Sequence, residues 1–185
     1  MRTSGKPSRE HLARWAENHY HYVGPFADYL GYIYARMPEG FTEAKDFLLA
    51  NMYEEEIGGD RHTDLLIRFG EASSTTADRM RDPDNMSPTT RALQSWCYAV
   101  AMREDPIVAV AGLVVGLESQ VPSIYRKQTP TPRDKYGFTD EEVELFDLMA
   151  TGQGVQLLHD CTRTAAASRH ERSGGDEASA PDWIL

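Results

Sequence analysis

Three side chains of the types that metal ions favour occupy predicted helical segments of this sequence. Glu55 lies on an apolar helical stripe, His62 follows it by seven residues, and Glu118 lies within an almost uninterrupted apolar segment. Seven residues is close to two helical turns, so His62 returns to the face of Glu55 if the helix continues, and Gly58-Gly59 leaves that continuity open. Two carboxylates and one imidazole facing a common interior form a ligand set suited to non-haem iron or manganese.

Glu118 carries the sharpest physical signal of the three. Residues 107–125 are apolar nearly all round, which predicts a central, buried helix. Pro122 cannot donate a hydrogen bond to the Glu118 carbonyl, so we expect a kink or a helix end beside the glutamate. A buried, unpaired carboxylate is costly or takes up a proton, and a cation relieves that cost. Two ordinary alternatives stay open: Glu118 turns out to solvent at a disrupted helix end, or His62 is a core histidine without a ligand role.

The elements that must position these residues are helices, because helix signals recur along the chain and strand signals do not. Six helical segments are predicted, each opened by a capping residue or a proline: residues 8–38 with a break at Gly24-Pro25, then 42–56, 60–69, 88–102, 107–127 and 139–168, opened by Ser8, Thr42, Asp60, Ser87-Pro88, Asp105-Pro106 and Thr139. Glu142 completes a capping box with Thr139. Residues 70–86 are predicted as a long loop and 128–138 as a connector.

These segments predict one all-α bundle of about six to seven helices over residues 1–170, followed by a flexible tail at 171–185. The 185-residue chain has a formal net charge of −10, which argues against nucleic acid or an anionic membrane as a partner. The apolar stretch 107–117 is too short to span a bilayer, and the N-terminus lacks a secretory signal. Cys97 and Cys161 indicate no disulfide framework, so the chain is expected to be soluble and cytoplasmic.

Four segments follow one another along the chain in this order: ARWAENHYHYVGPFADYL, NMYEEEIGGDRHTDLLIRFGEA, DPIVAVAGLVVGLESQVPSIY and YGFTDEEVELFDL. Over roughly residues 8–160 the chain resembles the haem-oxygenase-like di-metal oxidases, which share a superfamily with pyrroloquinoline quinone synthase and thiaminase II. In that family a Glu followed by a His supplies the first ligands, matching Glu55 and His62, and a Glu in the apolar helix matches Glu118. The resemblance implies a haem-oxygenase-like bundle, iron (possibly manganese) as cofactor, and a homodimer.

The last helix departs from the family pattern. A His, an Asp four residues later and a His three beyond that are expected there, but the positions hold Met149, Gln153 and Gln156. His159, about one turn further on, is a substitute if the helix shifts. The resemblance therefore implies one strong metal site and a doubtful second one, with these four residues as second-site or substrate-contacting candidates.

Three functions follow from these observations. The favoured one is a metal-dependent oxidase or oxygenase that acts with dioxygen on a small amino-acid-like or fatty-acid-like metabolite, through an incomplete di-metal site. A metal-free oxidase resembling pyrroloquinoline quinone synthase is the first alternative, and a non-catalytic ligand- or partner-binding member of the fold is the second. Side chains for which lining the pocket or contacting substrate competes with simple packing are His19, Tyr20, His21, Tyr22 and Tyr125.

Overall fold

The computed structural model describes residues 7–57 and 61–151, and every regular element in these residues is helical. The prediction of an all-α bundle is confirmed for this part of the chain. The expected tail and the candidates Gln153, Gln156 and His159 lie outside the described residues. The elements are α1 (Arg9–Val23), α2 (Phe26–Arg36), α3 (Thr42–Glu56), α4 (His62–Ala72), α5 (Ala77–Arg81), the 3-10 turn η1 (Pro83–Asn85), α6 (Pro88–Arg103), α7 (Pro106–Ala109), the π-helical η2 (Val110–Gly116), α8 (Val121–Gln128), the π-helical η3 (Pro132–Tyr136), the 3-10 turn η4 (Glu141–Val143) and α9 (Glu144–Thr151).

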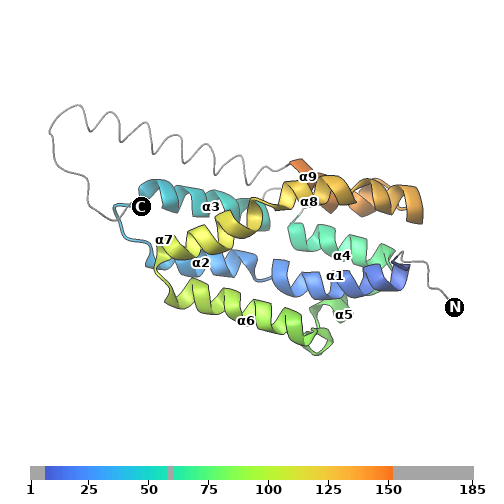
Figure 1. Cartoon of the computed structure of the whole chain (residues 1–185), viewed down its shortest axis with the longest axis horizontal. Helices are drawn as coiled ribbons and strands as arrows, with labels where there is room; N and C mark the ends of the chain where they lie inside the picture. The colour runs from blue at the N-terminus through green and yellow to red at the C-terminus, as the bar shows by residue number, and fades with distance from the viewer. Residues whose placement is uncertain (1–6, 58–60, 152–185) are drawn as a thin grey trace.

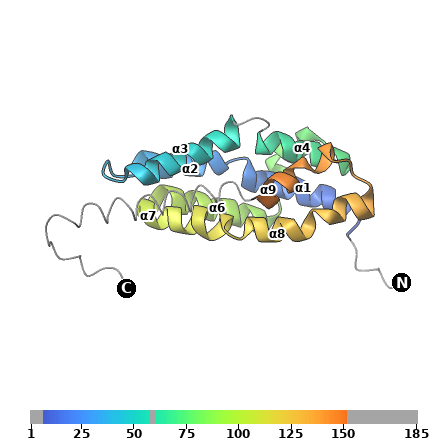
Figure 2. The same cartoon turned by 90° about the horizontal axis from the view of Figure 1, so that it is seen from above.

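Helices α1 and α2 run end to end through the middle of the bundle (Figure 1). The chain breaks between them at Gly24-Pro25, as predicted. Helices α4 and α5 pack on α1, α3 packs on α2, and α6 contacts both central helices. Seen from above, α3 and α4 lie on one side of this central pair, with α6, α7 and α8 on the other (Figure 2). Helix α9 packs back along α8.

The apolar interior consists of two clusters. One gathers side chains of α2, α3, α6, α7 and η2 around the fully buried Tyr29 and Leu30. The other gathers side chains of α1, α4, α8 and α9 around Phe69 and Phe146. Tyr22 packs against the first cluster and its chain neighbour Val23 against the second, so the two clusters meet at the end of α1.

Most of the predicted helix starts are confirmed. Ser8 caps α1, and its box is completed by the His11 side chain. The Thr139–Glu142 capping box forms, with the Thr139 N–H donating to Glu142 at 2.7 Å. Ser87-Pro88 and Asp105-Pro106 open their helices as expected.

The predicted cap of α3, Thr42, is wrong, and Asp60, the predicted cap of α4, lies outside the described residues. The first helical bonds run from Lys45 to the carbonyl of Phe41 and from Leu65 to that of Arg61. Those two acceptors are therefore the N-cap residues, and neither makes a side-chain capping bond. Thr42 instead occupies the first position within α3.

The predicted loop and connector are also wrong. Within residues 70–86, α4 continues to Ala72, and α5 forms because Thr76 caps it and Met80 anchors it in the core. The connector 128–138 is mostly helical, because wide π-type turns carry the chain to Tyr136. That helix ends at Gly137, whose φ of 70° is the left-handed conformation that glycine adopts readily.

The helical stretch from Pro106 to Tyr136 is longer than the apolar segment 107–117, although a turn at residues 119–120 interrupts it, so the expectation of a segment too short to span a bilayer is corrected. By length and composition alone it is the one helix among the described residues that could cross a membrane. A mostly buried core helix of a globular bundle meets the same criterion, but only 22% of the apolar window of this helix is buried, so the prediction of a central, buried helix over residues 107–125 is wrong. One such helix is weak evidence for a membrane span.

Gly70 is where packing leaves no room for a side chain. A Cβ added there would lie 2.3 Å from the sulfur of Met80, which is fully buried. We expect Gly70→Ala to lower the free energy of unfolding by about 1–3 kcal/mol, because the core must shift to admit a methyl group. Gly112→Ala is the matched control, since nothing lies within 4 Å of its Cβ position. Chemical denaturation measures both; equal stability of the two variants would contradict the packing at Gly70.

Candidate metal centre

Glu55 and His62 meet across the junction of two helices. Glu55 lies in the last turn of α3, which ends at Glu56, and His62 is the first residue of α4. The alternative of one continuous helix is therefore excluded. The Nδ1 atom of His62 nevertheless lies 2.7 Å from Oε2 of Glu55, and both side chains are largely buried.

This close contact lacks the direction of a hydrogen bond. Nδ1 of His62 is buried and has no hydrogen-bond partner among the described residues, even though the distance to Glu55 would allow one. Two ligands of one metal ion stand in such a relation, because bonds of about 2.1 Å place neighbouring ligand atoms roughly 3 Å apart. Burial alone would lower the pKa of His62, but the neighbouring carboxylates of Glu55, Glu118 and Glu54 together raise it overall.

Glu118 lies where the helical hydrogen bonding changes. The π-helical η2 ends at Gly116, a turn follows at residues 119–120, and Pro122 lies in the first turn of α8. The predicted interruption beside Glu118 is thus confirmed, and π-helical turns of this kind are frequent at functional sites. Tyr22 donates a long hydrogen bond of 3.4 Å to Oε1 of Glu118. Burial, followed by the charge of Glu55, raises the pKa of Glu118 to about 7.

The three predicted ligands line one small cavity of about 50 Å³. Met149, one of the four second-site candidates, lines it too. The other three candidates lie outside the described residues. The remaining lining comes from α1, α2 and α8: His19, Tyr22, Val23, Phe26, Val121 and Tyr125. The cavity therefore lies where the two apolar clusters meet.

Among the described residues, the donors at this cavity fit one ion. Glu55 and His62 are already adjacent, and Glu118 supplies a second carboxylate from across the cavity. In the part of the chain that the structure describes, no three acidic, histidine or cysteine side chains are gathered tightly enough to hold an ion as they stand. Glu118 would have to swing toward the other two. For a second ion, Met149 offers a thioether, which is a soft ligand that suits copper(I) rather than iron.

His19 belongs to the site as well, although the sequence suggested it only as a substrate contact in a metal-free enzyme. Its Nε2 lies 3.1 Å from the Tyr125 hydroxyl, and its ring stacks on Trp15. Burial lowers the pKa of His19 to about 4, so the ring is neutral at pH 7. The helical spacing of Trp15, His19, Tyr22 and Phe26 was the available signal. Helical spacing shows that these side chains share a buried face, but only the positions of the neighbouring helices show whether that face packs or lines a pocket.

The tyrosines and histidines of α1 divide between two faces. Tyr22 and Tyr125 line the cavity, and burial together with the Glu118 charge raises the pKa of both phenols, which keeps them protonated. Tyr20 and His21 do not line it, so of the two interpretations left open for these side chains, packing fits and pocket lining does not. Helix periodicity accounts for this, because residues one position apart point in different directions.

Comparison with known proteins identifies the family. Residues 13–151 match the family model described as an iron-containing redox enzyme. The chain belongs to this family. Its haem-oxygenase-like bundle, expected from the resemblance, is confirmed. Two curated relatives are named 4-aminobenzoate synthase. The one from Chlamydia trachomatis is 27% identical over 143 residues, covering 76% of this chain and 59% of its own. The one from Nitrosomonas europaea is 27% identical over 170 residues, covering 85% and 65%.

The chain spans about three fifths of the length of the curated relatives it matches, and a third, from Chlamydia muridarum, gives the same picture at 25% identity. The family supports iron and redox chemistry at a coarse level. The family match identifies neither catalytic residues nor a substrate for this chain.

The burial of Glu118 predicts how the metal-free protein responds to pH. Its folded-state pKa is raised, so its contribution to stability is present below the unfolded value of 4.5 and is lost as pH rises through about 7. We expect Glu118→Gln to raise the free energy of unfolding of chelator-treated protein by about 2 kcal/mol at about pH 8 and by almost nothing at about pH 4.

Denaturant titrations at the two pH values measure this difference. The control is Glu39→Gln, which changes an exposed loop carboxylate of the same type. A pH-independent effect of Glu118→Gln would show that the carboxylate is solvated in the folded state.

Proposed function

We propose that this chain is an iron-dependent oxidase or oxygenase that uses dioxygen on a small amino-acid-like or fatty-acid-like metabolite. The observation that carries the proposal is the contact of 2.7 Å between Nδ1 of His62 and Oε2 of Glu55, at a cavity that Glu118 also lines. The family description supports iron, and the name shared by the relatives makes 4-aminobenzoate the first product to test.

In this proposal Glu55, His62 and Glu118 hold the iron, which supplies the one-electron chemistry that dioxygen needs to react. The Tyr22 hydroxyl donates to Oε1 of Glu118 at 3.4 Å, a bond long enough to let this carboxylate swing toward the other two ligands. Neutral His19 and the protonated Tyr125 share a hydrogen bond, which provides a donor and an acceptor beside the centre. Val23, Phe26 and Val121 line the rest of the cavity and exclude water.

The substrate must enlarge this cavity. About 50 Å³ suits an ion with one or two small molecules, whereas sites for metabolites usually measure several hundred Å³. Met149 is the flexible, unbranched side chain of the lining, and its displacement is the least costly way to admit a larger molecule.

Two alternatives are separated from this proposal by whether iron binds. A metal-free oxidase would use the same polar side chains as hydrogen-bonding partners, and a non-catalytic member would bind a ligand without turnover. The separation of Glu118 from the Glu55–His62 pair is the observation that favours them. A thiaminase-like hydrolase has no support from Cys97, because burial raises the pKa of that thiol to about 11.

Manganese in place of iron, a second metal site, a cytoplasmic location and a homodimer stay predictions. Exposed apolar side chains on α6 and α7, two helices that contact one another, support the dimer: Leu93, Trp96, Met102, Ile107 and Val108.

Metal analysis tests the ligand set. Protein purified from iron-supplemented cells is expected to hold close to one iron per chain, and Glu55→Gln, His62→Gln and Glu118→Gln should each lower that content at least about tenfold, because each removes a strong ligand. Glu56→Gln is the matched control: Glu56 neighbours Glu55 but forms an exposed ion pair with Arg61. Iron that survives all three substitutions, or its absence from wild-type protein, would refute the metal centre.

Dioxygen consumption tests the reaction class. The reduced, iron-loaded protein is expected to take up dioxygen faster when an amino-acid-like substrate or a reductant is present. The rate of dioxygen uptake by His62→Gln should be lower by at least about 100-fold, because the substitution removes both an iron ligand and the His62–Glu55 ion pair. Chromatography of the products for 4-aminobenzoate tests the finer part of the proposal. Uptake without that product would keep the oxidase and discard the link to the relatives' named activity.

A further inference from the structure

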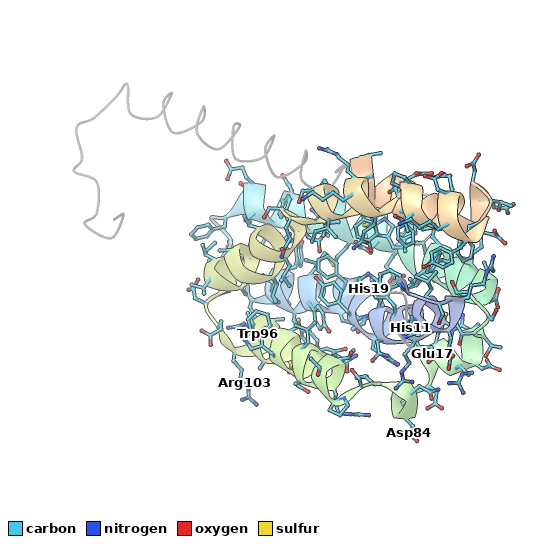
Figure 3. All side chains as sticks on the ribbon, turned by 45° about the vertical axis from the view of Figure 1, so that its right-hand side comes forward. His11, Glu17, His19, Asp84, Trp96 and Arg103 are labelled. Atoms are coloured by element: carbon cyan, nitrogen blue, oxygen red, sulfur yellow. The ribbon has the colours of Figure 1, made fainter. Side chains whose placement is uncertain are left out.

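A second concave site lies on the face of α1 opposite the metal centre, and different residues line it. An open cleft of about 900 Å³ is formed by the first half of α1, the end of α4 and the start of α5. Figure 3 shows His11 and Glu17, two of its lining residues, close together on α1, whereas Arg103 lies at the far end of the bundle. The lining contains three arginines against two glutamates, in a chain whose net charge is −10.

A buried glutamate organises two of these arginines. Glu17 is only 4% exposed, and it accepts hydrogen bonds from Thr75 at 2.6 Å, Arg79 at 2.9 Å and Arg14 at 3.3 Å. Burial alone would raise the pKa of Glu17, but these bonds lower it overall, so the carboxylate stays charged at neutral pH. Each arginine uses a single nitrogen in this contact and remains about half exposed. Their other N–H groups therefore remain available at the cleft that both arginines line.

Arg9 is fixed in a different way. Its two terminal nitrogens donate to the backbone carbonyls of Ala72 and Tyr136, and its guanidinium stacks over the Phe138 ring. Among the described residues it makes no ion pair with a carboxylate. Its positive charge at the cleft wall is thus not neutralised by an acidic side chain.

A hydroxyl without a partner lies beneath these charges. Ser73 is fully buried, lines the cleft, and its Oγ has no hydrogen-bond partner in the described part of the chain. The next residue, Ser74, has a φ of 80° and is the one non-glycine residue with a positive φ there. A buried donor left unsatisfied beside a strained residue marks a place where a ligand is expected.

We propose that this cleft binds the phosphoryl group of a small molecule, held by Arg9, Arg14 and Arg79 with Ser73 beneath. Guanidinium groups match phosphate oxygens with paired N–H donors. Three such groups and a hydroxyl offer more donors than the two oxygens of a carboxylate can accept. A tetrahedral anion with three or four oxygens uses them fully.

The site is independent of the proposed oxidase activity. None of its lining residues lines the metal cavity, although α1 contributes to both. The proposal therefore stands or falls on binding alone.

Calorimetric titration of the full chain with inorganic phosphate is the test. Wild-type protein is expected to bind phosphate saturably at millimolar concentration, and Arg14→Gln should weaken binding about tenfold, because one charge-assisted contact is lost. Ser73→Ala removes only the unpartnered hydroxyl and should weaken binding several-fold without loss of fold. Arg103→Gln changes an exposed arginine at the C-terminal end of α6, far from the cleft, and should leave binding unchanged.

Two further arms complete the experiment. Glu118→Gln should retain phosphate binding, which separates the cleft from any iron-bound phosphate. Glycerol phosphate that binds more tightly than inorganic phosphate would identify a phosphorylated metabolite as the natural ligand; the reverse order would identify the free ion. Absence of saturable binding to wild-type protein, or equal weakening by Arg14→Gln and Arg103→Gln, would overturn the proposal.

Discussion

The cost of holding carboxylates out of water is the constraint on which this structure depends. Glu55, Glu118 and His62 line one cavity at the junction of two apolar clusters. Of these three side chains, only the imidazole of His62 can carry a positive charge. Glu55 also lies in the last turn of α3, and this last turn contains three consecutive glutamates and no basic residue. That is the negative end of the helix dipole, so a positive charge at this point is favourable. A protonated His62 provides one, and a metal ion provides more.

Three interruptions of the helices lie around this cavity. The chain breaks between α1 and α2 just after Tyr22, between α3 and α4 beside Glu55 and His62, and after η2 beside Glu118. A regular helix would direct every buried side chain along one stripe and saturate its own backbone. Each break frees a polar side chain to turn inward, and the three breaks surround the same cavity.

Helix α1 serves two sites because its faces differ in chemistry. One face carries His19 and Tyr22, which pack against the metal cavity. The other carries Glu17, which is buried yet charged because Thr75 and two arginines satisfy its oxygens. Both faces show the same rule: a polar group survives burial where hydrogen-bond partners, most of them from distant parts of the chain, satisfy it.

The sequence by itself determined the helical class, the break at Gly24-Pro25, four of the helix starts and the three ligand candidates, because periodicity, proline and capping residues act over a few neighbours. It misjudged residues 70–86 and 128–138, where the burial of Met80 and π-type turns make helix out of turn-rich composition. Only the tertiary structure decided that Glu55 and His62 meet across two helices, that His19 joins them while His21 does not, and that Glu118 faces the same cavity. Those relations depend on how helices pack, and no local pattern specifies the distance between side chains on different helices.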